Sequence, residues 1–185
     1  MSNAKKNVEK LSKTLNPFTE EPEAEAAVAV ILKAVDEDLE ILLVKRAENP
    51  TDPWSGQMAF PGGKRDSKDR NLKQTVIRET LEETGINLNQ EGHFLGVLET
   101  QSSPRKPEIH VLPFIILLEQ EPQIKLNKKE LEWSTWISIE DLSKHEGTAQ
   151  FSFGKFPAYI LGTTVIWGLT YRIIEDLFHS LRSPT

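Results

Sequence analysis

The chain contains no cysteine among its 185 residues. This absence excludes disulfide bonds, thiolate nucleophiles, cysteine-based zinc sites and iron–sulfur clusters. A basic excess is also missing, because 22 Lys and Arg stand against 28 Asp and Glu, for a net charge of -6. We therefore expect no binding to duplex nucleic acid through a broad basic face. A nucleotide substrate is still compatible with this charge if divalent cations lie between carboxylates and phosphates.

Long apolar runs are missing as well. The longest one, residues 111–118, is interrupted by Pro113 and is too short to span a bilayer. Residues 1–13 are polar and lack the apolar stretch of a secretory signal. We therefore expect a cytoplasmic protein with no membrane partner. The length suits one domain, expected at residues 24–185, behind an N-terminal extension or short helix plus linker at residues 1–23.

The apolar patterns predict an α/β protein. Two β-rich runs, residues 27–35 and 39–44, flank an acidic turn and predict a hairpin. Further strands are expected at 57–60, 93–99, 109–119 and 133–139, and helices at 70–85, after Ser138 and at 163–181. This order predicts a mixed β-sheet with helices between and after the strands, which is an α/β sandwich.

Three glutamates crowd one side of the helix expected at residues 70–85. Glu79 is three residues before Glu82 and four before Glu83, and these spacings place carboxylates on the same side of a helix. Like charges at these spacings repel each other, and Arg78 offsets only part of that repulsion. A bound Mg²⁺ or Mn²⁺ offsets more of it, because clustered oxygen ligands without His or Cys suit hard cations. The alternative is a solvated charged face.

The segment from Gly63 to Ile86 resembles the Nudix box, G-x5-E-x7-R-E-U-x-E-E-x-G-U, in which U is a bulky apolar residue. The matching positions are Gly63, Arg78, Glu79, Glu82, Glu83, Gly85 and Ile86. Asp69 replaces the first Glu of the box, eight residues rather than seven separate it from Arg78, and Thr80 occupies a normally aliphatic position. The resemblance implies a Nudix-type α/β/α sandwich. It also implies hydrolysis of a nucleoside diphosphate linked to another moiety, by attack of water on a phosphorus.

The resemblance further implies roles for individual residues. The metal ligands would be Glu79, Glu82 and Glu83, together with a backbone carbonyl of Gly62 or Gly63. Arg78 would orient Glu79 through a charge-assisted hydrogen bond. Glu130, in a turn that precedes an expected strand, is the first candidate for the catalytic base, with Glu132 as the alternative. For both residues, an ordinary surface position is an equally compatible interpretation.

A wider match suggests the substrate class. Residues 55–64, followed by Asp66, resemble the Nudix branch that includes coenzyme A pyrophosphatases, and so do residues 166–170. Trp54 stands where this branch often has a histidine. Cations that are candidates for binding substrate phosphates are Arg46, Arg105 and Lys106, against the simpler alternative of solvated loop charges.

Several alternatives stay open at this level. The substrate could instead be ADP-ribose, a nucleotide sugar or a nucleoside triphosphate. The chain could also be a non-catalytic, nucleotide-binding Nudix module. In a third interpretation, the last expected helix, residues 163–181, is a dimerisation surface of a scaffold protein. A homodimer is compatible with the hydrolase hypothesis as well, and Trp167 is expected in the apolar face of that helix.

Overall fold

An eight-stranded mixed sheet forms the centre of the protein in a computed structural model that describes residues 2–19, 23–103 and 106–183. Its path is β3-β2-β1-β7-β5, with β4 beside β1, β6 beside β7 and β8 beside β2. The strands are β1 (Ala26–Val35), β2 (Asp38–Arg46), β3 (Met58–Ala59), β4 (Gly62–Lys64), β5 (Gly92–Val97), β6 (Gln101–Ser103), β7 (Lys106–Leu118) and β8 (Leu131–Ser138). The pair β1–β7 is parallel and the other pairs are antiparallel, so the expected mixed sheet is confirmed.

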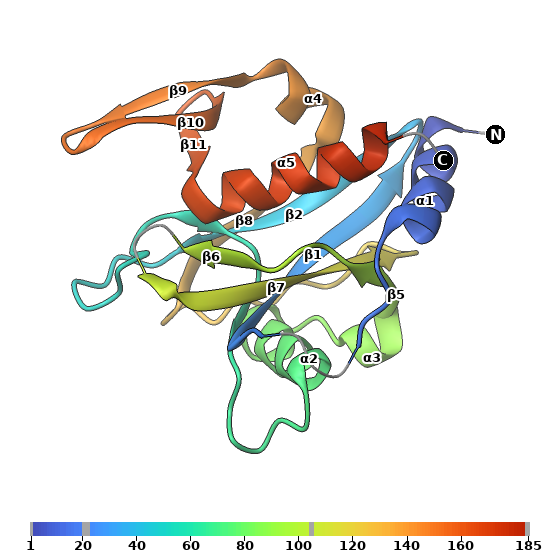
Figure 1. The fold of residues 1–185 in the computed structure, drawn as a ribbon, viewed down its shortest axis with the longest axis horizontal. Coiled ribbons are helices and arrows are strands. Elements are labelled where there is room, and N and C mark those ends of the chain that lie inside the picture. The colour runs from blue at the N-terminus through green and yellow to red at the C-terminus, as the bar shows by residue number, and fades with distance from the viewer. Residues whose placement is uncertain (1, 20–22, 104–105, 184–185) are drawn as a thin grey trace.

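Helices cover both faces of this sheet (Figure 1). On one face lie α1 (Asn3–Thr14) and α5 (Gly168–Arg182), and on the other lie α2 (Leu72–Thr84) and α3 (Leu88–Glu91). Alternate residues of β1 point to opposite faces of the sheet and contribute to two hydrophobic cores. Val30 and Leu32 belong to the core on the α5 side, whereas Ala29 and Ile31 belong to the core on the α2 side. The arrangement is the expected α/β/α sandwich. Within the described residues, no helix combines the length and apolarity needed to cross a bilayer.

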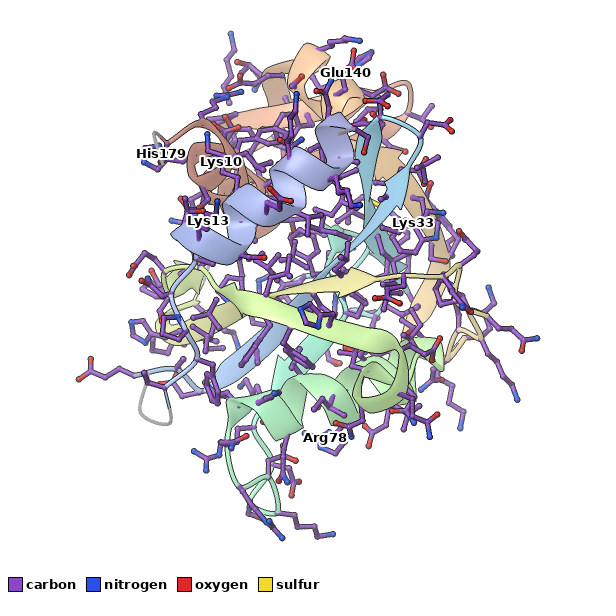
Figure 2. The ribbon with its side chains drawn as sticks, turned by 90° about the vertical axis from the view of Figure 1, so that its right-hand side faces the viewer. Lys10, Lys13, Lys33, Arg78, Glu140 and His179 are labelled. Atoms are coloured by element: carbon purple, nitrogen blue, oxygen red, sulfur yellow. The ribbon has the colours of Figure 1, made fainter. Side chains whose placement is uncertain are left out.

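Helix α1 packs onto the domain although it precedes the expected domain start at residue 24. Its Ala4 and Leu11 are buried in the same cluster as Ile174 and Leu177 of α5. Figure 2 shows α1, with Lys13 on it, on the opposite side of the sheet from α2. The N-terminal helix therefore contributes to the core but lies away from the helix that carries the three glutamates.

The chain after residue 144 differs from the sequence-based expectation. Following the short helix α4 (Ile139–Lys144), it forms a separate three-stranded sheet, β9 (Glu146–Phe151), β10 (Gly154–Leu161) and β11 (Thr164–Trp167). The expected helix at 163–181 was wrong in its first turn, because 164–167 pair with β10 and the helix begins at Gly168, which has a left-handed φ of 66°. Trp167 is thus a strand residue that packs against Phe151.

Candidate active site

The ends of α2 are determined by two local signals. The side chain of Asn71 accepts a hydrogen bond from the Gln74 amide at 3.0 Å and so caps the N-terminus. Gly85 ends the helix in the left-handed conformation, with φ 76°, which glycine adopts without a steric penalty. These caps confirm the expected helix and place its glutamate-bearing side against β4, which contributes Gly62 and Gly63.

Glu83 is an acidic side chain in an almost fully buried position. It is only 3% exposed, and its carboxylate accepts a hydrogen bond from the Gly62 amide at 2.9 Å. Burial raises the pKa of Glu83 to about 8, because one amide donor and the nearby charge of Arg46 compensate only part of the lost hydration. The negative charges of Glu79 and Glu130 raise this pKa further. Glu83 is therefore a carboxylate whose ionised form needs an additional positive partner.

Glu79 approaches the backbone of β4 at Gly63. A Cβ atom at Gly63 would lie 2.6 Å from the Cδ of Glu79, a distance that real contacts do not reach. The absence of a side chain at Gly63 is thus what lets the Glu79 carboxylate reach the strand. Burial raises the pKa of Glu79, whereas its ion pair with Arg78, at 2.7 Å, acts in the opposite direction.

Arg78 connects Glu79 to the loop before α2. Its guanidinium donates to Asp69 at 2.7 and 3.1 Å, to Glu79 at 2.7 Å and to Glu82 at 3.3 Å. Asp69 is 7% exposed and also accepts from the Thr75 hydroxyl at 3.0 Å. The hydrogen bond from Arg78 lowers the pKa of Asp69 to about 2. Asp69 therefore anchors Arg78, and Arg78 orients Glu79.

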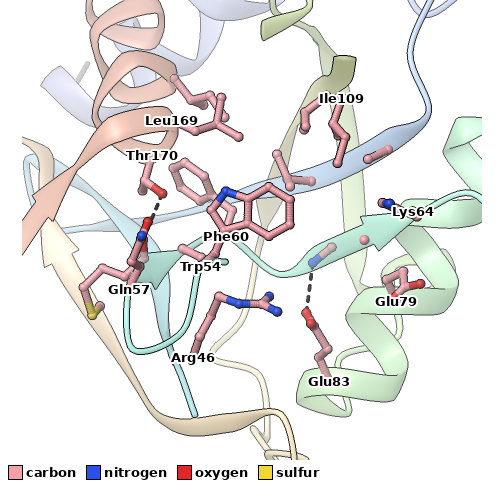
Figure 3. A pocket seen from close by; sticks show the side chains of 18 of the residues that line it. Arg46, Trp54, Gln57, Phe60, Lys64, Glu79, Glu83, Ile109, Leu169 and Thr170 are labelled. Atoms are coloured by element: carbon pink, nitrogen blue, oxygen red, sulfur yellow. Dashed lines mark hydrogen bonds between the residues drawn. The ribbon is translucent and has the colours of Figure 1, made fainter. Parts of the chain in front are cut away.

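A pocket of about 280 Å³ opens beside these carboxylates (Figure 3). One side of it carries the acidic groups Glu79, Glu83 and Glu130, together with Arg46. The other side is apolar, and its lining includes Trp54, Phe60, Ile109, Val111 and Leu169. An acidic side that can hold cations thus adjoins an apolar side that can hold the rest of a substrate.

The structure brings five of the predicted site residues to this pocket. The lining residues are Arg46, Gly63, Glu79, Glu83 and Glu130. The Glu82 side chain lies on the solvent side of α2 and is 55% exposed. Lys106, at the start of β7, lies 5.8 Å from the centre of the Trp54 ring. Arg105 lies outside the described residues.

The residues present fit a divalent cation by their chemistry, although the side chains do not form a closed metal cage. Among the described residues, no three His, Asp or Glu side chains are close enough together to hold an ion as they stand. Glu79 faces Arg78, and Glu83 faces the Gly62 amide. However, the pKa values of these two carboxylates are raised by burial and by the negative charges of neighbouring glutamates, including Glu130, and a bound cation would remove this cost.

Three contributions to this site were missed at the level of sequence. The sequence suggested only the backbone carbonyl of Gly62, as a metal ligand. In the structure the backbone N–H of Gly62 donates a hydrogen bond to Glu83. Asp69 was recognised as a departure from the box, although its ion pair with Arg78 could not be inferred from spacing. Trp54 was noted only for its unusual identity, and nothing in the local sequence indicates that it lines the pocket.

Comparisons with known proteins agree with this geometry. The family model of the NUDIX domain matches residues 24–157. An uncharacterized protein of Schizosaccharomyces pombe is 38% identical over 145 residues, which cover 75% of this chain but only 42% of that protein. The mitochondrial coenzyme A diphosphatase NUDT8 of Homo sapiens is 30% identical over 170 residues, covering 88% of this chain and 71% of the relative.

A solved structure shares the architecture. The NUDIX domain of Shewanella oneidensis NrtR, solved in complex with ADP ribose, superposes with a TM-score of 0.58. The superposition covers 87% of this chain and 90% of that one, at 18% identity, and so supports the fold alone. The match of the family model over most of the chain, together with the identity to NUDT8, shows the relationship directly. The chain belongs to the NUDIX domain family.

Proposed function

We propose that this chain is a Mg²⁺- or Mn²⁺-dependent pyrophosphohydrolase that cleaves a nucleoside diphosphate linked to another moiety. The observation that carries the proposal is the pair Glu79 and Glu83: a partly buried and a fully buried carboxylate, both with raised pKa values, that line one pocket together with Glu130. Burying uncompensated carboxylates lowers stability, and a cation bound in the active enzyme compensates for this cost. A merely solvated charged face would not bury Glu83.

In the proposed mechanism, each residue has a separate task. Glu79, Glu82 and Glu83 are the metal ligands, and bound cations would neutralise phosphate charge and acidify a water molecule. The Gly62 amide holds Glu83, and Arg78 holds Glu79. Glu130 is the candidate general base.

The position of Glu130 suits this role. Its side chain lines the pocket and is exposed, and its Oε1 accepts from the Asn127 amide at 2.7 Å, which leaves the second carboxylate oxygen for a proton from water. Glu132 does not line the pocket. Arg46, which does, is the candidate contact for a substrate phosphate.

Coenzyme A or one of its derivatives is the substrate that we propose first. The support is the relative named as a coenzyme A diphosphatase, which matches most of this chain. The apolar side of the pocket also suits a substrate with a large organic part beyond its diphosphate. ADP-ribose, nucleotide sugars and nucleoside triphosphates are the alternatives. A cytoplasmic location and a homodimer stay predictions, to be checked by fractionation and by size-exclusion chromatography.

A substrate panel tests this proposal. Coenzyme A, its acyl esters, ADP-ribose, NADH, diadenosine polyphosphates and nucleoside triphosphates are incubated with Mg²⁺ or Mn²⁺, and phosphorus-containing products are followed. We expect coenzyme A to yield adenosine 3′,5′-bisphosphate and phosphopantetheine, and we expect Glu82→Gln to lower this yield. Cleavage of another substrate alone would replace coenzyme A in the proposal. Tight nucleotide binding without any turnover would instead support a non-catalytic module.

A further inference from the structure

An aromatic residue on the apolar side of the pocket has a lysine close to its ring. Trp54 lines the pocket and packs against the buried cluster formed by Ala26, Ile109 and Val111. Figure 3 shows its indole beside Phe60, with the α2 glutamates across the pocket in this view. The Nζ atom of Lys106 is 5.8 Å from the centre of the indole. Trp54 thus contributes an aromatic ring to the pocket lining, with a positive charge close to that ring.

The loop that carries Trp54 is held in place by an ion pair. The Asp52 carboxylate accepts a hydrogen bond from the Trp54 amide at 2.9 Å and pairs with the Arg46 guanidinium at 2.7 Å. The Asp52 side chain is only 13% exposed, so water competes little for these contacts. The Gln57 amide donates to the Trp54 carbonyl at 3.2 Å and closes the turn. The position of Trp54 is therefore fixed before a ligand binds. Arg46, which supports Trp54 through Asp52, also lines the acidic side of the pocket.

Lys106 has a charge that its described surroundings do not neutralise. Among residues 2–19, 23–103 and 106–183, no carboxylate lies within ion-pair distance of its Nζ atom. A cation close to a partly exposed indole favours a ligand group that is planar and also carries negative charge. A nucleotide whose ribose bears a phosphate monoester has both properties. A phosphopantetheine arm is flexible and uncharged beyond its diphosphate, and so matches this pair less well.

We propose that Trp54 and Lys106 bind the nucleotide half of the substrate. Trp54 stacks on the adenine ring, and Lys106 contacts a phosphate on the ribose. The diphosphate then lies between this pair and Glu79 and Glu83, within reach of Arg46. This inference rests on the proposed function, and it makes the ribose phosphate a determinant of substrate choice.

The first test compares coenzyme A with dephospho-coenzyme A, which differs only by the ribose phosphate. We expect wild-type protein to favour coenzyme A, and Lys106→Met to reduce the ratio of the two kcat/KM values by about 10-fold, mainly through KM. Lys106→Arg should keep the preference, because it keeps the charge. Lys13→Met removes an exposed lysine on α1 as a matched control. An unchanged ratio in Lys106→Met, or an equal loss on both substrates, would overturn the role of Lys106.

The second test measures binding without turnover. Adenosine 3′,5′-bisphosphate is titrated into metal-free protein while tryptophan fluorescence is recorded and its affinity is measured by calorimetry. We expect quenching that disappears in Trp54→Phe but persists in Trp133→Phe, which alters a partly exposed tryptophan of β8 outside the pocket. Trp54→Ala should weaken binding by about 10-fold or more, because base stacking is lost. The unfolding midpoint of each variant is measured as a control that the variant is folded.

The two tests separate failure of this inference from failure of the proposed function. If wild-type protein binds the bisphosphate through Trp54 yet cleaves no diphosphate, the hydrolase proposal is wrong and the nucleotide site stands. If coenzyme A is cleaved while Trp54→Ala binds the bisphosphate as well as wild type does, the nucleotide site is wrong and the hydrolase stands. Quenching of Trp54 by 4′-phosphopantetheine, but not by the bisphosphate, would place the other half of the substrate here and would also overturn the inference.

Discussion

The Glu83 carboxylate lies 2.9 Å from the Gly62 amide, buried between α2 and β4. This hydrogen bond joins β4 to α2 at Glu83, the residue whose charge is hardest to accommodate. A single neutral donor leaves most of the hydration of that carboxylate unreplaced, and its pKa rises accordingly. At the pH at which the enzyme would work, the metal-free protein should therefore be less stable than the metal-bound protein.

This cost predicts how stability depends on pH. The pKa of Glu83 is raised from 4.5 to about 8, so the folded state binds a proton that the unfolded state has lost throughout that interval. Stability in EDTA should consequently fall as the pH rises from 4.5 towards 8. Chemical denaturation across this range is the measurement, and Glu83→Gln should flatten the profile. A wild-type profile that rises over the same interval would contradict the assignment.

Metal addition should reverse that loss. Cations that bind the folded state alone stabilise it, and they compete with the proton on Glu83. The rise in the unfolding midpoint caused by Mg²⁺ or Mn²⁺ should therefore be larger at the upper end of the interval than at its lower end. Thermal unfolding with and without each ion measures this difference. In Glu83→Gln the rise should be small at every pH, and an undiminished rise would place the ion elsewhere.

Gly63→Ala should separate activity from folding. A Cβ atom at this position would lie 2.6 Å from the Cδ of Glu79, so the glutamate must move. We expect a loss of about 10- to 100-fold in kcat, comparable to disturbing the support of a metal ligand, with little change in stability. Gly147→Ala is the matched control, because its new Cβ would meet nothing closer than 3.6 Å. Equal activity in the two variants would show that the close approach is dispensable.

Asp69→Asn should weaken both the fold and the positioning of Arg78. We expect a loss of about 2 kcal/mol in the free energy of unfolding at neutral pH, since a buried charge-assisted hydrogen bond is lost. The pKa of Asp69 is lowered from 3.8 to about 2, so the stability that it contributes is present above 3.8 and is lost as the pH falls through 2.

Acid denaturation of wild type and Asp69→Asn measures this contribution. The variant should lose less stability than wild type between pH 3.8 and 2, because it has no carboxylate to protonate at this position. Its activity should fall because Arg78 is no longer held in line with Glu79. Parallel acid profiles would mean that Asp69 contributes nothing through its charge.

The sequence predicted best where a local signal exists. The glycine at position 85 and the helical spacing before it predicted α2, and the apolar runs around an acidic turn predicted the hairpin of β1 and β2. The alignment of Glu79 and Glu83 on one side of a helix follows from spacing alone. In each case the determining interactions lie within a few residues of one another along the chain.

What the sequence did not predict depends on contacts between distant segments. Residues 164–167 carry apolar spacing that is also compatible with a helix, and only pairing with β10 makes them a strand. The burial of Glu83 depends on β4 lying against α2, and the place of Trp54 depends on the ion pair between Arg46 and Asp52. Glu82, grouped with its neighbours by sequence, is turned to solvent by its position on the helix.

The most direct test of the metal-dependent hydrolase account is the turnover of coenzyme A as Mg²⁺ is titrated, in wild-type protein and in Glu83→Gln at equal folded concentration. We predict that wild type releases adenosine 3′,5′-bisphosphate only when the ion is present. Glu83→Gln should retain its fold but lose about 100-fold or more of this activity. This loss is larger than the loss expected when a residue that only supports a metal ligand is replaced. Turnover that is independent of the ion, or undiminished in Glu83→Gln, would contradict the account.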